Sequence, residues 1–440
     1  MIETLWYVGG IVFIALGIGL SIGLHEIGHL VPAKKFGVKV PAYAIGLGPT
    51  LFKITRGETT YAIKLIPLGG FITMIGMYPP EREGKSKKAK NPKGFFSDMI
   101  LSARNAHSEH ITPADKNRKF YQLAVWKRLI IMFGGPFMNL VLGTLLMIVV
   151  MVGIGTNQQS NKIAEVGSCV IADYSVQQVC AANDSKSPAM IAGLQSGDRI
   201  KSVNGIEFKD WGTLTNQLQI GEVAKLEIER GGKQISIDVS PVLAKRATTD
   251  AAGKVIVDST GQPVFAERPV LGIIFDVERK PESIVSALQK SAYGVAQVGQ
   301  MIFTLPQQLT EVAISTFTGQ ERNPNGAVSV VGIAQISGTV ASTDSVELID
   351  KLSTGLLILA SLNFALFGFN MLPLLPLDGG HIAGGIYEWI KRGIYKVLRK
   401  PEPGPADTAL LMPATWFVFI LLMAMSALLI IADLVNPILI

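Results

Sequence analysis

The sequence predicts a polytopic α-helical membrane protein with about four transmembrane helices, a membrane-associated β-hairpin or sheet, and a separate β-rich domain. Hydrophobic residues make up 48% of the 440 residues, and the mean hydropathy is +0.37. Such values are typical of chains with several membrane spans. The apolar residues gather in segments at about 5 to 30, 126 to 153, 353 to 377 and 411 to 434. Strand-like alternation is confined to the stretches between them.

Residues 1–37 are expected to form a transmembrane helix. From Trp6 through Leu24 no residue carries a charge, and a run of this length can cross a bilayer. The segment has no basic start and no small-residue cleavage site, so it does not read as a cleaved signal peptide. We therefore expect it to remain in the mature protein.

This first helix ends in the motif His25-Glu26-Ile27-Gly28-His29. On a helix the two His side chains face one side, and Glu26 can reach the same space. The motif H-E-x-x-H supplies two nitrogen ligands for Zn²⁺ and a carboxylate that can act as a general base. The alternative is a structural His pair, but three unpaired polar groups at membrane depth would be costly. The sequence therefore predicts a catalytic metal site.

Charged residues divide the chain into blocks of opposite sign. Residues 31–128 hold 18 Lys and Arg against 6 Asp and Glu, a net charge of +12. Residues 156–352 hold 17 against 21, a net charge of −4. The positive-inside rule places the basic block in the cytoplasm and the acidic block outside. The basic excess reports topology, and no recognition motif indicates a nucleic-acid partner.

Residues 38–78 are expected to form a membrane-associated β element. The stretch 61–72 is too apolar for an ordinary solvated loop, and a sheet would keep its backbone hydrogen-bonded at membrane depth. An exposed edge there could pair with an extended substrate. This makes Leu65 and Ile66 candidate substrate-binding residues. A small cytoplasmic sheet with one half-buried face is the alternative.

Residues 79–124 read as a basic cytoplasmic loop close to anionic lipid, and residues 125–156 as the second transmembrane helix. Gly134-Gly135-Pro136 allows a close helix approach. Asn139 follows, and it can either bond a neighbouring helix or support the metal site from behind.

Residues 160–281 read as a β-rich domain outside the membrane, with Asn204-Gly205 as a hairpin turn. The run from Ala192 to Gly205 resembles the bacterial PDZ motif A-G-L-x-x-G-D-x-I-x-x-V-N-G, and this resemblance implies a peptide-binding module. Cys169 and Cys180 lie in this domain. A disulfide between them is plausible in an oxidising compartment, and the sequence leaves their pairing open.

Residues 282–350 are expected to be helical and to lie on the outer membrane surface, because Pro306 and polar residues interrupt a possible fifth span. Residues 351–381 are expected to form the third span. Its end carries Pro373, Pro376 and then Asp378-Gly379-Gly380, which indicates an unwound helix of the kind that lines a site. Residues 382–410 read as a cytoplasmic loop and 411–440 as the fourth transmembrane helix.

The end of the third span contributes the remaining site candidates. Asp378 is expected at the depth of the His pair and can be the third zinc ligand, which leaves the fourth position to water. Asn370 and Asn363 either contact a substrate backbone or join helices. His381 is a rival metal ligand.

In this order, HEIGH at 25–29, GGPFMN at 134–139, a PDZ-like domain and NMLPLLPLDG at 370–379 resemble the site-2 protease family of intramembrane zinc metalloproteases. The single PDZ-like unit is similar to the Gram-positive or actinobacterial branch. The resemblance implies a multi-pass protease of the bacterial cytoplasmic membrane, with an extracytoplasmic PDZ-like domain, that cuts single-span membrane proteins such as anti-sigma factors. Residue by residue, it implies His25, His29 and Asp378 as Zn²⁺ ligands, Glu26 as the base and Asn370 as a substrate-positioning residue.

Two other classes of protein remain as alternatives. A zinc-binding transporter would also place His and Asp in its spans, but repeated helical motifs are more typical of such proteins than one H-E-x-x-H with a peptide-binding domain. A catalytically inactive membrane receptor could use the PDZ-like unit alone.

Overall fold

The structure is a computed structural model that describes residues 2–80, 95–106, 112–173, 180, 184–209, 211–248, 255–256, 262–323 and 326–438. The chain divides into two compact units. Unit 1 comprises Met1–Ile154 and Glu282–Ile440, and unit 2 comprises Gly155–Pro281. Part of the expected basic loop, residues 81–94 and 107–111, lies outside the described residues.

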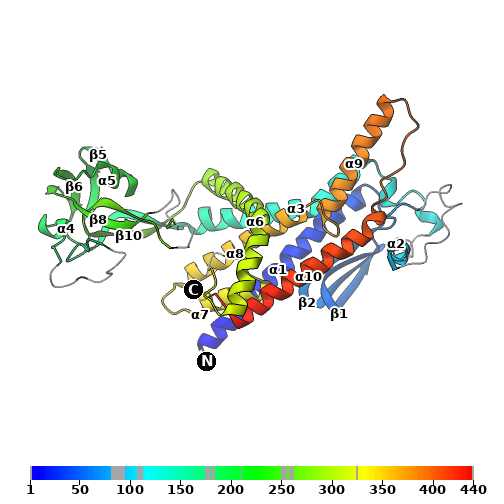
Figure 1. The fold of residues 1–440 in the computed structure, drawn as a ribbon, viewed down its shortest axis with the longest axis horizontal. Coiled ribbons are helices and arrows are strands. Elements are labelled where there is room, and N and C mark those ends of the chain that lie inside the picture. The colour runs from blue at the N-terminus through cyan, green and yellow to red at the C-terminus, as the bar shows by residue number, and fades with distance from the viewer. Residues whose placement is uncertain are drawn as a thin grey trace. The chain divides into compact units, whose positions relative to one another are not determined.

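Unit 1 contains four helices that are long and apolar enough to cross a membrane (Figure 1). They lie where the sequence predicts spans, and both chain ends lie at the same end of these helices in Figure 1. The four are α1 (Ile2–Lys35), α3 (Val125–Ile148, continued by a π-helical turn over Val149–Ile154), α8 (Leu348–Asn370) and α10 (Met412–Val435).

The other helices of unit 1 lie between these spans in the sequence. Helix α6 (Ile284–Thr318) is long but less apolar, and with α7 (Val330–Ser342) it occupies the region expected on the membrane surface. Short helices occur at α2 (Phe95–Ala106), Pro113–Asp115, Phe120–Gln122 and Thr408–Leu411.

The third span differs from the sequence prediction in how it ends. The sequence suggested a span over 351–381 and a loop over 382–410. In the structure α8 stops at Asn370, and after a non-helical segment a new helix, α9 (Asp378–Val397), begins. Pro373 and Pro376 lie in that segment, where they lack the backbone N–H that a continuous helix requires. Asp378 is therefore the first residue of a separate helix.

Helices α1 and α3 touch through their glycines. A Cβ on Gly28 would collide with the carbonyl of Gly134, and a Cβ on Gly134 would collide with the carbonyl of Gly28. Only glycine permits so close an approach of two backbones. The crossing brings the metal motif of α1 against the GGPFMN segment of α3.

Strands β1 (Ala42–Arg56) and β2 (Thr59–Thr73) pair antiparallel and fold back on themselves. Residues 42–45 of β1 pair on one side with residues 60–63 of β2 and on the other with residues 70–73. Consequently residues 70–73 form one edge of this sheet. Strand β2 also packs against α1.

A buried ion pair joins α9 to α3. The Glu388 carboxylate is 1% exposed and accepts hydrogen bonds from Arg128 of α3 at 2.5 Å and from the backbone N–H of Ala406 at 2.7 Å. Arg392 lies 2.8 Å from the same carboxylate. These contacts fix the orientation of α9, the helix that begins with Asp378.

Replacing Glu388 by Gln should lower the free energy of unfolding by about 3–5 kcal/mol, because it leaves the Arg128 guanidinium buried without its countercharge. Chemical denaturation of the detergent-solubilised protein measures this change. Glu402→Gln is the matched control, since the Glu402 side chain is 71% exposed and an exposed pair contributes about 1 kcal/mol or less. Equal stability of the two variants would contradict the inference that the buried pair of Glu388 and Arg128 stabilises the fold.

Unit 2 is built on a six-stranded sheet with the order β10-β3-β4-β6-β7, in which the short β5 pairs with β4. Asn204 and Gly205 have positive φ and form the expected turn between β4 and β5. A second, two-stranded sheet pairs β8 with β9. The strands are β3 (Thr156–Val166), β4 (Arg199–Val203), β5 (Ile206–Glu207), β6 (Ala224–Arg230), β7 (Lys233–Val239), β8 (Val242–Ala247), β9 (Phe265–Val270) and β10 (Ile273–Lys280).

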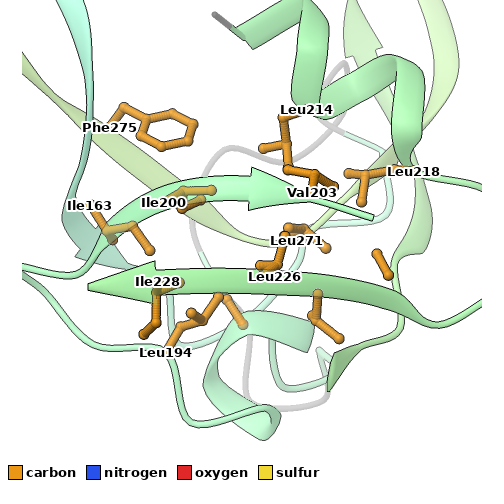
Figure 2. Close-up of a cluster of buried hydrophobic side chains, with 13 residues drawn as sticks. Ile163, Leu194, Ile200, Val203, Leu214, Leu218, Leu226, Ile228, Leu271 and Phe275 are labelled. Atoms are coloured by element: carbon orange, nitrogen blue, oxygen red, sulfur yellow. The ribbon is translucent and has the colours of Figure 1, made fainter. Parts of the chain in front are cut away.

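Unit 2 has its own hydrophobic core. Figure 2 shows aliphatic side chains from β4 and β6 near Leu214 of the short helix α5 (Trp211–Gln217) and near residues of the connecting segments. Ala189 of the short helix α4 (Pro188–Ile191) belongs to the same core. Its fully buried members include Ile163, Ile200, Val203, Leu214, Leu226 and Ile228. Cys169 and Cys180 form a disulfide in this unit, with their Cα atoms 6.1 Å apart.

Candidate metal centre

Three side chains from opposite ends of the sequence meet in unit 1. The Nε2 atoms of His25 and His29 lie 3.2 Å apart. Asp378 Oδ2 lies 3.2 Å from His25 Nε2 and 3.3 Å from His29 Nε2. Among the described residues this is the one group of His, Cys, Asp and Glu compact enough to hold a metal ion.

The orientation of the His29 ring is set by the backbone of α3. His29 Nδ1 lies 2.7 Å from the carbonyl oxygen of Ile131, and a carbonyl can only accept, so Nδ1 donates its proton there. In the neutral ring the Nε2 atom then carries a lone pair. This lone pair faces Asp378 and His25.

The His25 ring is contacted from behind by Asn139. Asn139 is fully buried, and its Nδ2 lies 3.1 Å from His25 Nδ1, while its Oδ1 has no hydrogen-bond partner. A carboxamide rotated by 180° would turn Oδ1 toward His25 Nδ1, where it could accept a proton and satisfy the buried oxygen.

The donor set fits a zinc ion. Zinc bonds to imidazole nitrogen and carboxylate oxygen at about 2.0–2.2 Å in a tetrahedral arrangement, which places neighbouring donors about 3.3 Å apart. The three separations here are 3.2, 3.2 and 3.3 Å. Asp378 Oδ2 is buried and has no hydrogen-bond donor. With both imidazoles neutral, three donors that face one another in this way favour a cation between them.

Gly135 leaves the space beside these donors open. A Cβ at this position would collide with the Nε2 atoms of both His29 and His25. The glycine that lets α3 approach α1 thus also makes room for an ion.

Glu26 lies next to this group but outside it. Its side chain is 9% exposed, and its carboxylate lies beside the backbone N–H of Ile72. A Cβ built on Gly70 would come 3.2 Å from Glu26 Cγ. The free edge of the small sheet, residues 70–73, therefore runs beside Glu26.

The remaining sequence candidates are distributed around this centre. His381 is not part of the donor group, and its ring lies 6.4 Å from that of Tyr78, centroid to centroid. Asn363 is fully buried and donates to Ser21 Oγ of α1 at 2.9 Å, a placement that accords with the alternative of joining helices. Asn370 donates to the Leu366 carbonyl at 3.0 Å.

Leu65 and Ile66 lie on β2 and are 54% and 46% exposed. The strand segment next to Glu26 is a different part of β2, residues 70–73. Residues 70–72 belong to the stretch 61–72 that the sequence predicts as a possible edge, but Leu65 and Ile66 are the residues that it indicates within that stretch. The glycines at 69 and 70 are a signal that could have indicated residues 70–73, because glycine often marks a close backbone approach.

Two imidazoles, a carboxylate and a neighbouring Glu, held among helices of membrane-spanning length, define a membrane-embedded metalloenzyme of the H-E-x-x-H type. Comparison with known proteins specifies the family. The family model described as peptidase family M50 matches residues 13–400, and the chain belongs to this family, the site-2 proteases.

Individual relatives agree over nearly the whole chain. Zinc metalloprotease Rip1 of Mycolicibacterium smegmatis is 31% identical over 444 residues, which cover 97% of this chain and 98% of that protein. Rip1 of Mycobacterium tuberculosis is 30% identical, with 98% of each chain covered. A putative zinc metalloprotease of Staphylococcus aureus is 25% identical, with 96% and 97% covered. The resemblance seen in the sequence is confirmed, and the protein is an intramembrane zinc metalloprotease with membrane-protein substrates.

Proposed function

We propose that His25, His29 and Asp378 hold the catalytic zinc, and that the enzyme hydrolyses a peptide bond in or near the transmembrane segment of single-span membrane proteins. The observation that carries this proposal is the convergence of the three donors at separations of 3.2 to 3.3 Å. The proposed class of reaction is regulated intramembrane proteolysis, with anti-sigma factors as one class of substrate.

The zinc-binding residues, Glu26 and the surrounding helices have separate tasks in this proposal. When bound, zinc supplies a Lewis acid that polarises the scissile carbonyl and makes the attacking water more acidic. Glu26 is the general base that takes the proton of that water and returns it to the leaving amine. The surrounding helices exclude bulk water from the site, which strengthens these electrostatic interactions.

The edge of the small sheet is the proposed guide for the substrate. A helical substrate hides its peptide bonds and has to unwind before cleavage, and its freed backbone groups then need partners inside the membrane. Residues 70–73 present strand backbone beside Glu26, so an extended substrate could pair there. This segment is placed better for the task than Leu65 and Ile66, while Asn370 remains a proposed substrate contact.

The proposed topology puts the basic ends of the spans in the cytoplasm and unit 2 outside. Lys34 and Lys35 end α1, Lys127 and Arg128 begin α3, and Lys391 and Arg392 lie on α9. All these cations belong to one end of the spans, as the positive-inside rule requires of the cytoplasmic side. Unit 2, with its resemblance to PDZ domains and its disulfide, would then meet the outer part of a substrate.

The experiment that tests this proposal is cleavage of a single-span substrate by the purified, membrane-reconstituted protein. Cleavage should stop when a chelator removes zinc and return when zinc is restored. Membership of a protease family argues against the two alternative functions, a zinc-binding transporter and a catalytically inactive membrane receptor. Cleavage that persists in the metal-free protein would contradict the proposal.

Asn139 is proposed to orient His25. With the amide turned so that Oδ1 accepts from His25 Nδ1–H, the His25 Nε2 lone pair is free for zinc. Replacing Asn139 by Ala should weaken zinc binding by about 10- to 100-fold, measured by competition with a chelating dye. Asn139→Asp keeps an acceptor at the same place and should retain more of the affinity. If the Ala variant bound zinc like the parent, Asn139 would have only a packing role.

A further inference from the structure

Helix α9 carries an apolar stripe that points away from the helix bundle. The stripe consists of Ile386, Ile390, Ile394 and Val397, which recur at helical spacing and are 43%, 51%, 52% and 83% exposed. Glu388, on the other side of the helix, is 1% exposed and bonded to Arg128 of α3. Figure 1 shows the later part of α9 extending away from the other helices of unit 1. This stripe therefore needs an apolar environment that the bundle does not supply.

Cations lie on both flanks of the stripe. At 100° per residue, Lys391 falls on one flank and Lys396 on the other, and Lys400 follows the helix. Within the described part of the chain none of these three lysines forms an ion pair with a carboxylate. The only other acidic residue of α9 besides Asp378 is Glu388, which is already engaged with Arg128 and Arg392. The exposed face of α9 is thus apolar along its middle and positive along its margins.

Aromatic residues complete this pattern. Tyr387 and Trp389 are 59% and 67% exposed. The Lys391 ammonium lies 5.6 Å from the centre of the Tyr387 ring. Tyr and Trp collect at the boundary between lipid tails and headgroups, where one end of the side chain is apolar and the other is hydrated.

A hollow of about 1120 Å³ opens between α9 and α10 beside the stripe. Leu374, Leu411 and Val418 contribute to its apolar lining, and Lys391 contributes a positive charge. Arg104 also lines the hollow, but its charge is paired with that of Asp407. A hollow with apolar walls and a lysine at its margin fits the chemistry of a phospholipid, with its chains inside and its phosphate at Lys391.

We propose that α9 is an interfacial helix that docks on an anionic phospholipid leaflet, with its apolar stripe among the acyl chains and Lys391, Lys396 and Lys400 at the headgroup phosphates. An amphipathic helix with flanking lysines and interfacial aromatic residues is typical of this mode of membrane binding. Charge complementarity selects anionic lipid over zwitterionic lipid.

Docking of α9 has a direct connection to the metal centre. Asp378 is the first residue of α9, so a leaflet that holds the stripe also restrains the helix that carries the third donor. The docking surface itself does not depend on the proposed catalytic roles, and it can be tested without measuring cleavage.

A probe at position 397 tests the docking. Because Cys169 and Cys180 are joined in a disulfide, Val397→Cys introduces a thiol that can be labelled selectively with a polarity-sensitive fluorophore. The full-length protein is reconstituted in vesicles of phosphatidylcholine, with or without phosphatidylglycerol. In the vesicles that contain phosphatidylglycerol we expect blue-shifted emission and protection from a water-soluble quencher. A probe at Lys233→Cys, on an exposed strand residue of unit 2, should behave alike in both vesicles.

Charge variants separate the headgroup contact from the apolar contact. Lys391→Gln combined with Lys396→Gln should lower the affinity of α9 for the anionic leaflet about fivefold for each cation removed. The protection of the probe at position 397 reports this affinity. Lys225→Gln combined with Lys233→Gln changes the net charge equally on unit 2 and should have no effect. High salt should mimic the loss of the two α9 lysines.

Three results would overturn the proposal. The first is a probe at 397 that stays open to the quencher in both kinds of vesicle. The second is equal protection in phosphatidylcholine alone, which would remove the role of the anionic headgroup. The third is protection in detergent that rises with protein concentration, which would show that a second copy of the chain covers the stripe.

Discussion

Replacing Glu26 by Gln should lower the rate of peptide-bond cleavage by about 100- to 10,000-fold, because a general base contributes a factor of this size. Gln has nearly the same shape as Glu but cannot take the proton of the attacking water. Glu26 is not one of the three converging donors, so the variant should still bind zinc. The pairing of lost activity with retained metal is the expected result.

The two measurements for this variant are the cleavage rate and the zinc content of the same preparation. Glu3→Gln serves as the matched control, since Glu3 lies on the same helix and is exposed at its start. That variant should cleave like the parent. A Glu26→Gln protein that cleaves at the parental rate would exclude Glu26 as the base, and one that loses its zinc would indicate a role as a ligand.

Replacing Asp378 by Asn should remove both zinc and activity. The Asp378 carboxylate is the only negative charge among the three donors, and an amide is a much weaker zinc ligand than a carboxylate. The loss of zinc affinity should exceed the about 10- to 100-fold expected for removing a supporting hydrogen bond. Zinc content by elemental analysis, measured together with cleavage, checks this expectation.

Asp344→Asn is the control for the Asp378 variant, because Asp344 is an exposed residue between α7 and α8. It should retain full zinc content. A folded Asp378→Asn protein with normal zinc content would assign the third ligand elsewhere. His381, which faces Tyr78 in the structure, would then be the first residue to examine.

Local patterns in the sequence were enough to predict the four spans and the members of the donor group. Each span is a continuous apolar run, and His25, Glu26 and His29 follow one another on a single helix turn. Asp378 could be paired with them because charged residues at membrane depth are rare and costly. In these cases the information lies within a few residues.

The contacts that depend on tertiary packing could not be predicted in this way. No sequence pattern shows that the Ile131 carbonyl bonds His29, since every residue has a carbonyl. In the sequence, Arg128 falls in the basic block 31–128 and Glu388 in the expected loop 382–410, whereas the fold buries them together. The folded-back register of β2 likewise selected residues 70–73, and not the more apolar residues 65 and 66, as the edge beside Glu26.

The helix that begins at Asp378 was also missed in the sequence. The prolines at 373 and 376 predicted an interruption, and the sequence also predicted that the chain would continue as a loop. The stripe of Ile386, Ile390 and Ile394 was hidden in the sequence by the charged residues between its members, which are Glu388, Lys391 and Arg392. Helical periodicity inside a charged segment was the signal that could have revealed it.

The donor group joins the first and last thirds of the chain, since His25 and Asp378 are separated by 353 positions (378 − 25). A ribosome makes the two imidazoles about 350 residues before it makes the carboxylate (378 − 25 = 353). An unfinished chain therefore has the motif of a protease without its complete set of donors. The three donors can meet only after the chain has been made as far as Asp378 and α9 has packed against α3.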